Sequence, residues 1–452
     1  MIEDTICAPA TPPIPSPIGI VRISGPGARR AVDSIFRPAE RLEPRKACFG
    51  TIVDKGMPVD DVIAVWYRAP KSYTGEEMAE IFCHGNPIIV QKIVRLLLEQ
   101  GVRMATPGEF TRRAFVNGKT DLTGAEAVRH IITARSEWEI EASLRQMHGA
   151  LREVIGDLRA RITSLKADVE ARIDFPEEED VEDLPSESVY RAMAEIRDSI
   201  AECLSRCRAG ERLSHGLDVT IVGKPNVGKS SILNLLLNQE RAIVSSIPGT
   251  TRDVIRETIQ IGGMPVNLED TAGMGSPSDE IEKIGIDMSA RRIESSSCLI
   301  LVLDATTGIT DEDVSIIEKT KGKNRIIVIN KIDAGAHETV ARMREEFMED
   351  VVILSARTGY GLADLRRAIA QSLQCECVEK EHTFIADTRV ISILERSMRE
   401  SDRILDLISN RAPEEVVAFE LQVIMDLLAE VTGEISPDHV LDSIFSRFCI
   451  GK

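Results

Sequence analysis

The feature that most constrains this chain is a glycine-rich stretch near its middle, Gly223-Lys224-Pro225-Asn226-Val227-Gly228-Lys229-Ser230. The apolar run before it, residues 217–222, has the length and content of a buried strand, and residues 232–237 after it have those of a helix. A strand, a glycine loop and a helix in this order are the context that a phosphate-binding loop requires. The glycines let the backbone turn its N–H groups toward a polyphosphate, and the helix N-terminus adds the positive end of its dipole. A glycine-rich turn without a ligand is the plainer alternative, which the flanking strand and helix disfavour.

Individual residues of this loop have separate expected roles. Lys229 is placed to reach the β- and γ-phosphates, and the Ser230 hydroxyl is placed to bind Mg²⁺. The other nucleotide contacts expected here come from Asn226, Val227, Gly228 and Ser231. The stretch therefore predicts a nucleoside triphosphate site that takes Mg²⁺.

Two later motifs are placed to complete the phosphate end of that site. Residues 249–253 supply Thr251, whose hydroxyl and carbonyl can reach Mg²⁺ and the γ-phosphate. Asp270 ends a predicted strand and can hold a water molecule on Mg²⁺, while the N–H of Gly273 can touch the γ-phosphate. Between them, Thr271 and Ala272 are expected beside the nucleotide.

Two further motifs are suited to a guanine base. In Asn330-Lys331-Ile332-Asp333, the Asp333 carboxylate can accept two N–H bonds from a guanine edge, which adenine cannot supply. Ser355-Ala356-Arg357 follows the last predicted strand and places backbone N–H groups near the guanine oxygen. Any one of these short motifs is weak evidence. All of them in this order, each at a strand end, indicate a GTP site.

The group that orients the attacking water is not evident from these motifs. Met274 stands where a Ras-like enzyme has a glutamine that orients water, and a methionine cannot do so. Either the protein needs an external activator, or another group orients the water. Asp279, Glu280 and Glu282 follow closely, although each also suits an ordinary solvated carboxylate at the start of a helix.

Length and charge limit the class of protein. A chain of 452 residues suggests about two to four domains. It has no apolar run of the ~18 residues needed to span a bilayer, and its first residues lack a basic targeting segment, so we expect a cytoplasmic protein without a membrane partner. The net charge of -18 argues against a surface devoted to RNA. Two local basic patches remain candidates for binding RNA. One is Arg112-Arg113, and the other comprises Arg152, Arg159, Arg161 and Lys166. A solvated helix face also explains the second patch.

The order of predicted elements gives the domain organisation. Residues 1–118 are predicted to be an α+β domain, with strands at 19–24, 49–53, 62–67 and 78–83 and helices at 87–100 and 109–117. Residues 119–215 read as long helices, 216–374 as alternating strands and helices, and 375–452 as helices only. The expected fold is therefore multidomain α/β, with a Ras-like P-loop GTPase domain inserted into a discontinuous helical-bundle domain.

With these residues in hand, the chain resembles the bacterial tRNA-modification GTPases of the MnmE family, also called TrmE. The resemblance covers nearly the whole length and rests on the GTP motifs together with residues 4–6, 10–13, 72–76, 107–115 and the ending Phe448-Cys449-Ile450-Gly451-Lys452. It implies that residues 1–118 bind a tetrahydrofolate derivative, in the 5-formyl or 5,10-methylene form, and form the homodimer. It also implies that the GTPase domains meet when GTP and K⁺ bind. With the flavoprotein MnmG, in a heterotetramer, such proteins add a carboxymethylaminomethyl-type group to C5 of the wobble uridine of certain tRNAs.

The resemblance also implies roles for single residues. Asn226, the carbonyls of Ser245 and Ile247, and Thr250 should hold K⁺, with Ser246, Pro248 and Gly249 beside the nucleotide. Glu282 should orient the attacking water, in a catalytic set with Lys229 and Thr251. Arg22, Glu80, Lys119 and Lys452 should contact the folate. Cys449 should take part in the modification, with a buried structural thiol as its alternative.

The chain departs from the family pattern at Ile14-Pro15-Ser16-Pro17, where a glycine- and arginine-rich turn is usual, and at Gly275, where an arginine is common. Two other functions fit parts of the sequence. A ribosome-assembly GTPase would share the GTP motifs but should carry an RNA-binding domain after residue 374. A folate enzyme regulated by GTP would need a catalytic carboxylate near the folate carbon, for which Glu80 is the only candidate found.

Overall fold

A computed structural model describes residues 4–174, 186–238, 257–270, 296–334, 337–347, 351–374 and 383–452. The chain divides into two compact units. The first unit comprises Met1–Ile132, Ser143–Leu204 and Asp387–Lys452, and the second comprises Thr133–Ala142 and Ser205–Ala386. The finer boundaries expected at residues 118, 215 and 374 stay a prediction.

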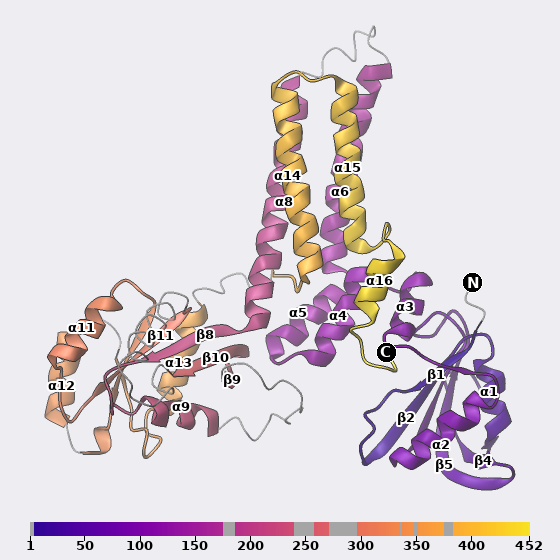
Figure 1. Ribbon diagram of the computed structural model, residues 1–452, viewed down its shortest axis with the longest axis horizontal. Coiled ribbons are helices and arrows are strands. Elements are labelled where there is room, and N and C mark those ends of the chain that lie inside the picture. Colours follow the sequence, from indigo (N-terminus) through magenta and orange to yellow (C-terminus); the bar gives the residue numbers. More distant parts are fainter. Residues whose placement is uncertain are drawn as a thin grey trace, which may run out of the picture. The chain divides into compact units, whose positions relative to one another are not determined.

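The N-terminal part of the first unit is built on a seven-stranded sheet of order β3-β4-β5-β6-β2-β1-β7. Its strands are β1 (Ile6–Pro9), β2 (Ser16–Ser24), β3 (Phe36–Pro38), β4 (Ala47–Asp54), β5 (Met57–Tyr67), β6 (Met78–Gly85) and β7 (Arg103–Met104). The helices α1 (Ala28–Ile35) and α2 (Pro87–Leu98) pack against this sheet (Figure 1). Ile23, Ile81 and Leu97 are fully buried in the core of this part. The predicted α+β architecture is confirmed, although β1, α1, β3 and β7 were not among the predicted elements.

The rest of the first unit is helical. Its helices are α3 (Glu109–Val116), α4 (Leu122–Thr133), α5 (Glu137–Met147), α6 (Ala150–Asp174), α8 (Ser186–His215), α14 (Thr388–Ser409), α15 (Glu414–Thr432) and α16 (Asp438–Phe445), of which α4, α5 and α8 also enter the second unit. Because α15 packs against both α6 and α14, helices from before and after the inserted segment form one bundle, as predicted (Figure 1). Among the described residues, no helix combines the length and apolar character that crossing a bilayer requires.

The apolar repeat that runs through residues 144–169 suggests continuous helix, but the structure divides it. A break at His148 and Gly149 separates α5 from α6, and Gly149 has a φ of +100°, which favours glycine. Downstream, α6 buries Leu151, Ile155 and Leu158 against its neighbours at helical spacing. Residues 175–180 form an acidic stretch in the sequence that favours a loop between helices, and they lie outside the described residues.

One of the predicted basic patches is wrong. Arg113 is almost fully buried, and its guanidinium forms ion pairs with Asp4 at 2.8 Å, Glu76 at 3.2 Å and Glu109 at 2.9 Å. The pKa of Glu109 is about 2, because hydrogen bonds from Arg103, Thr106 and Arg113 outweigh the effect of burial, which would raise it. Arg113 is therefore a structural ion-pair centre and not part of an RNA-binding surface.

The second unit contains a six-stranded sheet of order β13-β12-β11-β8-β10-β9, parallel except for the β9–β10 hairpin. Its described elements are β8 (Leu217–Val222), α9 (Lys229–Asn238), β9 (Glu257–Ile261), β10 (Met264–Asp270), β11 (Cys298–Asp304), α11 (Asp311–Lys319), β12 (Arg325–Asn330), the 3₁₀ turn η1 (Ile332–Ala334), α12 (His337–Glu346), β13 (Val351–Ile353) and α13 (Leu362–Gln374). Two apolar clusters cover opposite faces, so β11 is buried at every position. The parallel strands end at one edge, which is where such sheets bind ligands.

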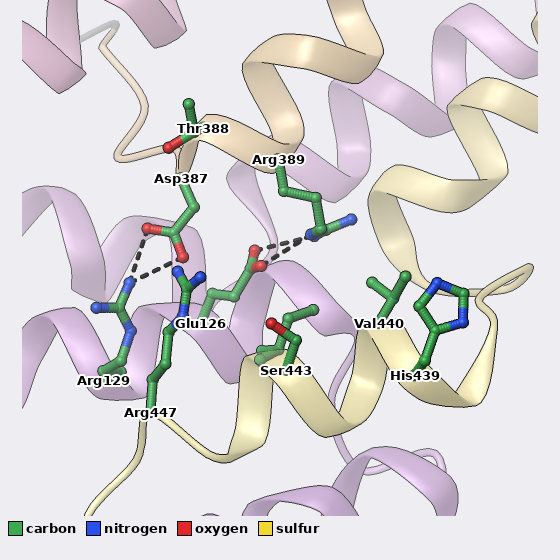
Figure 2. A pocket seen from close by; sticks show the side chains of 10 residues that line it. Glu126, Arg129, Asp387, Thr388, Arg389, His439, Val440, Ser443 and Arg447 are labelled. Carbon is green, nitrogen blue, oxygen red and sulfur yellow. Dashed lines mark hydrogen bonds and ion pairs between the residues drawn. The ribbon is translucent and has the colours of Figure 1, made fainter.

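Ion pairs line a cavity of about 310 Å³ among α4, α14 and α16 of the first unit. Figure 2 shows Arg129 facing Asp387, with its Nη2 2.7 Å and 2.8 Å from the two carboxylate oxygens, and Arg389 facing Glu126. The Nε2 of His130 lies 3.0 Å from the same Asp387 carboxylate. Burial would raise the pKa of Asp387, but hydrogen bonds and charge from His130 and Arg129 lower it to about 2.

We expect the contribution of Asp387 to stability to depend on pH. Because its folded-state pKa lies below the ordinary value of 3.8, the stabilisation is complete above that value and is lost as the pH falls through about 2. The difference corresponds to about 2 kcal/mol. The gap in unfolding free energy between the wild type and Asp387→Asn should therefore shrink from pH 7 to pH 3, as measured by urea titration. A gap of equal size at both pH values would contradict this.

Candidate nucleotide-binding site

The glycine-rich loop joins β8 to α9, as predicted, and its backbone has no room for side chains at the glycines. A Cβ on Gly223 would lie 2.5 Å from the carbonyl oxygen of Val302, and one on Gly228 would lie 2.3 Å from Nδ2 of Asn330. Gly228 also has a φ of +100°. The loop is therefore held close to the sheet edge, with the N-terminus of α9 directly after it, which fits a bound polyphosphate.

Lys229 is the first residue of α9 and is buried. Its Nζ donates hydrogen bonds to the carbonyl of Gly223 at 2.8 Å and to that of Lys224 at 2.9 Å. Ser230 and Ser231 follow on the exposed first turn of the helix. The ammonium group is thus held within the loop, and the hydroxyl expected to bind Mg²⁺ belongs to the next residue in the sequence.

Asn330 links the phosphate loop to the predicted guanine site. Its Nδ2 donates to the carbonyl of Val227 at 2.8 Å, and its Oδ1 accepts from the N–H of Ala356 at 3.0 Å. The side chain is 1% exposed, so both bonds lie in a low-dielectric interior. One amide therefore fixes the separation between the loop after β8 and the loop after β13.

Lys331 makes a second link. Its Nζ donates to the carbonyl of Asn226 at 2.7 Å and forms an ion pair with Asp304 at 2.7 Å. Burial alone would raise the pKa of Asp304, but hydrogen bonds from Lys331 and Thr306 hold it below its usual value. The ion pair holds the Lys331 side chain in place beside the phosphate loop.

Asp333 has a carboxylate that is fixed on one side. The hydroxyl of Ser355 donates to its Oδ1 at 2.7 Å, and Arg357 lies 3.9 Å from its Oδ2 on the exposed side. A carboxylate has more acceptor positions than these partners fill, so it can still accept N–H groups from a base. The structure thus brings Asn330, Asp333, Ser355 and Ala356 together, as the motifs predicted.

The remaining predicted nucleotide contacts are only partly placed. Asp270 ends β10 and pairs in register with Ile221 of β8, so its backbone reaches the same edge of the sheet as the phosphate loop. Outside the described residues lie Ser245, Ser246, Ile247, Pro248, Gly249, Thr250, Thr251, Thr271, Ala272, Gly273 and Glu282. Their roles stay predictions.

The predicted folate contacts gather on the sheet of the first unit. Arg22 and Glu80 are cross-strand partners on β2 and β6, and the Arg22 Nε and Nη2 donate to one carboxylate oxygen of Glu80 at 2.9 Å and 2.8 Å. The Arg22 guanidinium also lies over the ring of Tyr73, 5.4 Å from its centroid. Tyr67 donates to the other oxygen of Glu80 at 3.2 Å. The aromatic members were not predicted, although Tyr73 falls within a stretch that carried the family resemblance.

The end of the chain completes this cluster. The carbonyl of Gly451 accepts a hydrogen bond from Nη1 of Arg22 at 3.0 Å, and that of Lys452 accepts one from the N–H of Phe110 at 3.2 Å. Burial and the nearby charge of Arg22 lower the pKa of Lys452. Cys449 is exposed, so the alternative of a buried structural thiol is wrong. Lys119 follows α3 in the sequence, and its Nζ donates to the carbonyl of Pro70 at 3.2 Å.

The fold defines the class of protein. A parallel sheet with one antiparallel edge hairpin, the phosphate loop after the strand β8 and the guanine motifs after β12 and β13 make up a Ras-like P-loop GTPase domain.

Comparison with known proteins identifies the family. The family model of the MnmE helical domain matches residues 122–449, and that of the GTP-binding protein TrmE N-terminus matches residues 5–119. The tRNA modification GTPase MnmE of Thermotoga maritima is 41% identical over 452 residues, which cover 99% of this chain and 100% of that protein. The protein of the same name from Aquifex aeolicus is 40% identical and covers 100% of both chains. The chain belongs to the MnmE (TrmE) family of tRNA modification GTPases.

Proposed function

We propose that this chain is a K⁺-stimulated GTPase, activated when two GTPase domains meet, that drives modification of the wobble uridine in certain tRNAs. The observation that carries the proposal is the junction at the sheet edge, where Asn330 and Lys331 bind the carbonyls of Val227 and Asn226. It holds the phosphate loop and the guanine motifs as one site. The name of the full-length relatives supports the link to tRNA modification.

A K⁺ site next to Asn226 is part of the proposal. Asn226 has a φ of +64°, and its exposed side-chain amide has no hydrogen-bond partner among the described residues. This amide is therefore available to hold an ion, together with the carbonyls of Ser245 and Ile247 and with Thr250. A cation there supplies positive charge to the transition state, as an arginine finger does.

The chain's own residues carry the remaining roles. Lys229 binds the β- and γ-phosphates, and Ser230, Thr251 and Asp270 hold Mg²⁺ directly or through water. Glu282 orients the attacking water, because Met274 cannot. Asp333 selects guanine through two N–H bonds.

The first unit supplies the modification chemistry in this proposal. Arg22, Glu80 and Lys452 lie together and, with Lys119, bind a tetrahydrofolate derivative that provides a one-carbon unit. The exposed thiol of Cys449 takes part in the modification. The chain acts in the cytoplasm as a homodimer, in a heterotetramer with the flavoprotein MnmG, and the group added is of the carboxymethylaminomethyl type.

A ribosome-assembly GTPase is the second candidate, and one observation weighs against it. Such a protein should carry a separate RNA-binding domain after residue 374. In the described part of that segment, α14 and α15 pack into the bundle with α6, and the tail binds Arg22.

The GTP hydrolysis rate in K⁺ and in Na⁺, at equal ionic strength, tests the proposal. We expect a faster rate in K⁺ and a loss of about 10²-fold or more in Glu282→Ala, because the attacking water loses its orienting group. Glu280→Ala is the matched control, since it removes a neighbouring carboxylate, and it should keep most of the rate. Equal rates in both salts would rule out the K⁺ mechanism, and an unchanged rate in Glu282→Ala would remove Glu282 from it.

A further inference from the structure

Lys224, the second residue of the phosphate loop, has a side chain that the roles above do not use. Its Nζ lies 2.8 Å from Oδ2 of Asp313, 3.1 Å from Oγ1 of Thr307 and 3.2 Å from Oγ1 of Thr310. The side chains of Lys224 and Asp313 are 12% and 0% exposed. An ion pair so well removed from water is costly to form unless each charge is well coordinated.

The acceptor of this ion pair is fixed by the start of α11. Oδ2 of Asp313 also accepts from the N–H of Thr310 at 3.0 Å and from its hydroxyl at 2.7 Å, within a capping box. These bonds hold the carboxylate in one place before Lys224 reaches it. Asp313 therefore offers the phosphate loop a rigid anchor point on α11.

The backbone of Lys224 connects that anchor to the phosphate-binding lysine. The carbonyl of Lys224 is one of the acceptors of the Lys229 ammonium group, at 2.9 Å. The residue whose side chain is tied to α11 thus also holds Lys229 in the loop. If the side chain were released, the carbonyl and the adjoining loop amides would lose their fixed position.

We propose that Lys224 is a positioning residue for the GTPase reaction, and that it acts through Asp313 to preset the phosphate loop for the nucleotide phosphates. The proposal rests on the proposed GTPase function of the same loop. Lys224 itself does not contact the phosphates, because its ammonium group is turned into the Thr307, Thr310 and Asp313 cluster. A loop that is already ordered binds its ligand without losing further conformational entropy.

The alternative is that the pair only stabilises the fold. The two roles differ in what a variant with both charges removed should do. In Lys224→Met, Asp313 is left as a buried unpaired carboxylate, which should lower the melting temperature. The double variant Lys224→Met with Asp313→Asn has no unpaired charge, so its melting temperature should recover, but the loop is still without its anchor.

The test uses the full chain, with nucleotide affinity, kcat, KM and melting temperature measured for each variant. We expect Lys224→Met to weaken both GDP and GTP binding about 10-fold or more and to lower kcat, since a charge-assisted anchor is lost. The double variant should show the same loss of affinity despite its recovered melting temperature. Lys224→Arg keeps the charge and should restore affinity to within about threefold.

Lys321→Met is the control, because Lys321 lies just beyond the other end of α11 in an exposed pair with Glu318. A double variant with affinity and kcat equal to those of this control would overturn the proposal in favour of a purely structural pair. Affinity losses that add in the double variant would show that Lys224 does not act through Asp313. If the wild type itself neither bound nor hydrolysed GTP, that result would contradict the proposed GTPase function and not only the role of Lys224.

Discussion

Asp333→Asn should weaken GTP binding by about 10²- to 10³-fold, because a charged acceptor of two N–H bonds is replaced by a neutral amide. The Ser355 hydroxyl holds Oδ1 of Asp333 at 2.7 Å, so the side chain cannot turn freely to compensate. In the variant, an NH₂ group has to face the N–H donors of guanine, which leaves buried donors unpaired. The fold should be little affected, since the carboxylate is partly exposed.

Inosine triphosphate makes this test specific for the base. It lacks the amino group of guanine, so it can donate only one of the two N–H bonds, and the gap between wild type and Asp333→Asn should be smaller for it than for GTP. Asp364→Asn serves as the control, since Asp364 lies on α13 in an exposed pair with Arg367. Equal losses for both nucleotides would contradict the assignment of Asp333 to the guanine edge. Affinities can be read from titrations with fluorescent nucleotide analogues.

Arg389→Met should lower the free energy of unfolding of the first unit by about 3–5 kcal/mol. Arg389 donates to both oxygens of Glu126, at 2.9 Å and 3.0 Å (Figure 2). It also donates to the carbonyls of Glu430 and Val431 at the end of α15. Burial raises the pKa of Glu126, so this carboxyl depends on the arginine for its charged form. Without Arg389 it must either stay charged and unpaired or take up a proton, and both alternatives destabilise the fold.

Denaturant titration at pH 7 measures this effect, and two variants bracket it. Adding Glu126→Gln to Arg389→Met should recover part of the loss, because the unpaired charge is removed. Arg396→Met removes an exposed arginine from the same helix, one that lies 3.8 Å from Glu430, and should cost less than about 1 kcal/mol. A loss in Arg389→Met no larger than that of Arg396→Met would show that the buried pair is not a main support of the bundle.

The sequence predicts most of the fold where a local pattern is complete. The alternation of strands and helices over residues 216–374 was predictable, because strands such as β11 and β12 are apolar runs that end at a polar residue. By contrast β1 has only four residues and ends at Pro9, too short to stand out, and α1 follows a glycine- and proline-rich turn. The break at Gly149 was missed because the apolar spacing continues across it.

The candidate site was predictable to the extent that its residues fall in short motifs. The motifs placed Asn330, Asp333, Ser355 and Lys229 at strand and helix ends, and the structure brings them to one edge of the sheet. The contacts among them were not predictable, since the bond from Asn330 to Val227 spans 103 positions and that from Lys224 to Asp313 spans 89. Such contacts depend on the order of the strands in the sheet, and a local sequence pattern does not predict that order. Arg113 was misjudged for the same reason, because its partners Asp4 and Glu76 lie far from it in the sequence.

The bond between Arg22 and Gly451 has a consequence for the synthesis of the protein. These residues are 429 positions apart, and a ribosome adds about 5 to 20 residues per second, so about 20 to 90 s separate their appearance. The sheet that carries Arg22 and Glu80 can form early in that interval, whereas residues 449–452, which join them, are added only after residues 119–448. A chain that stalls within residues 119–448 therefore has the strands of this cluster but not its closing segment. When residues 449–452 lie beside Arg22, translation of that molecule has therefore proceeded through all of the residues in between.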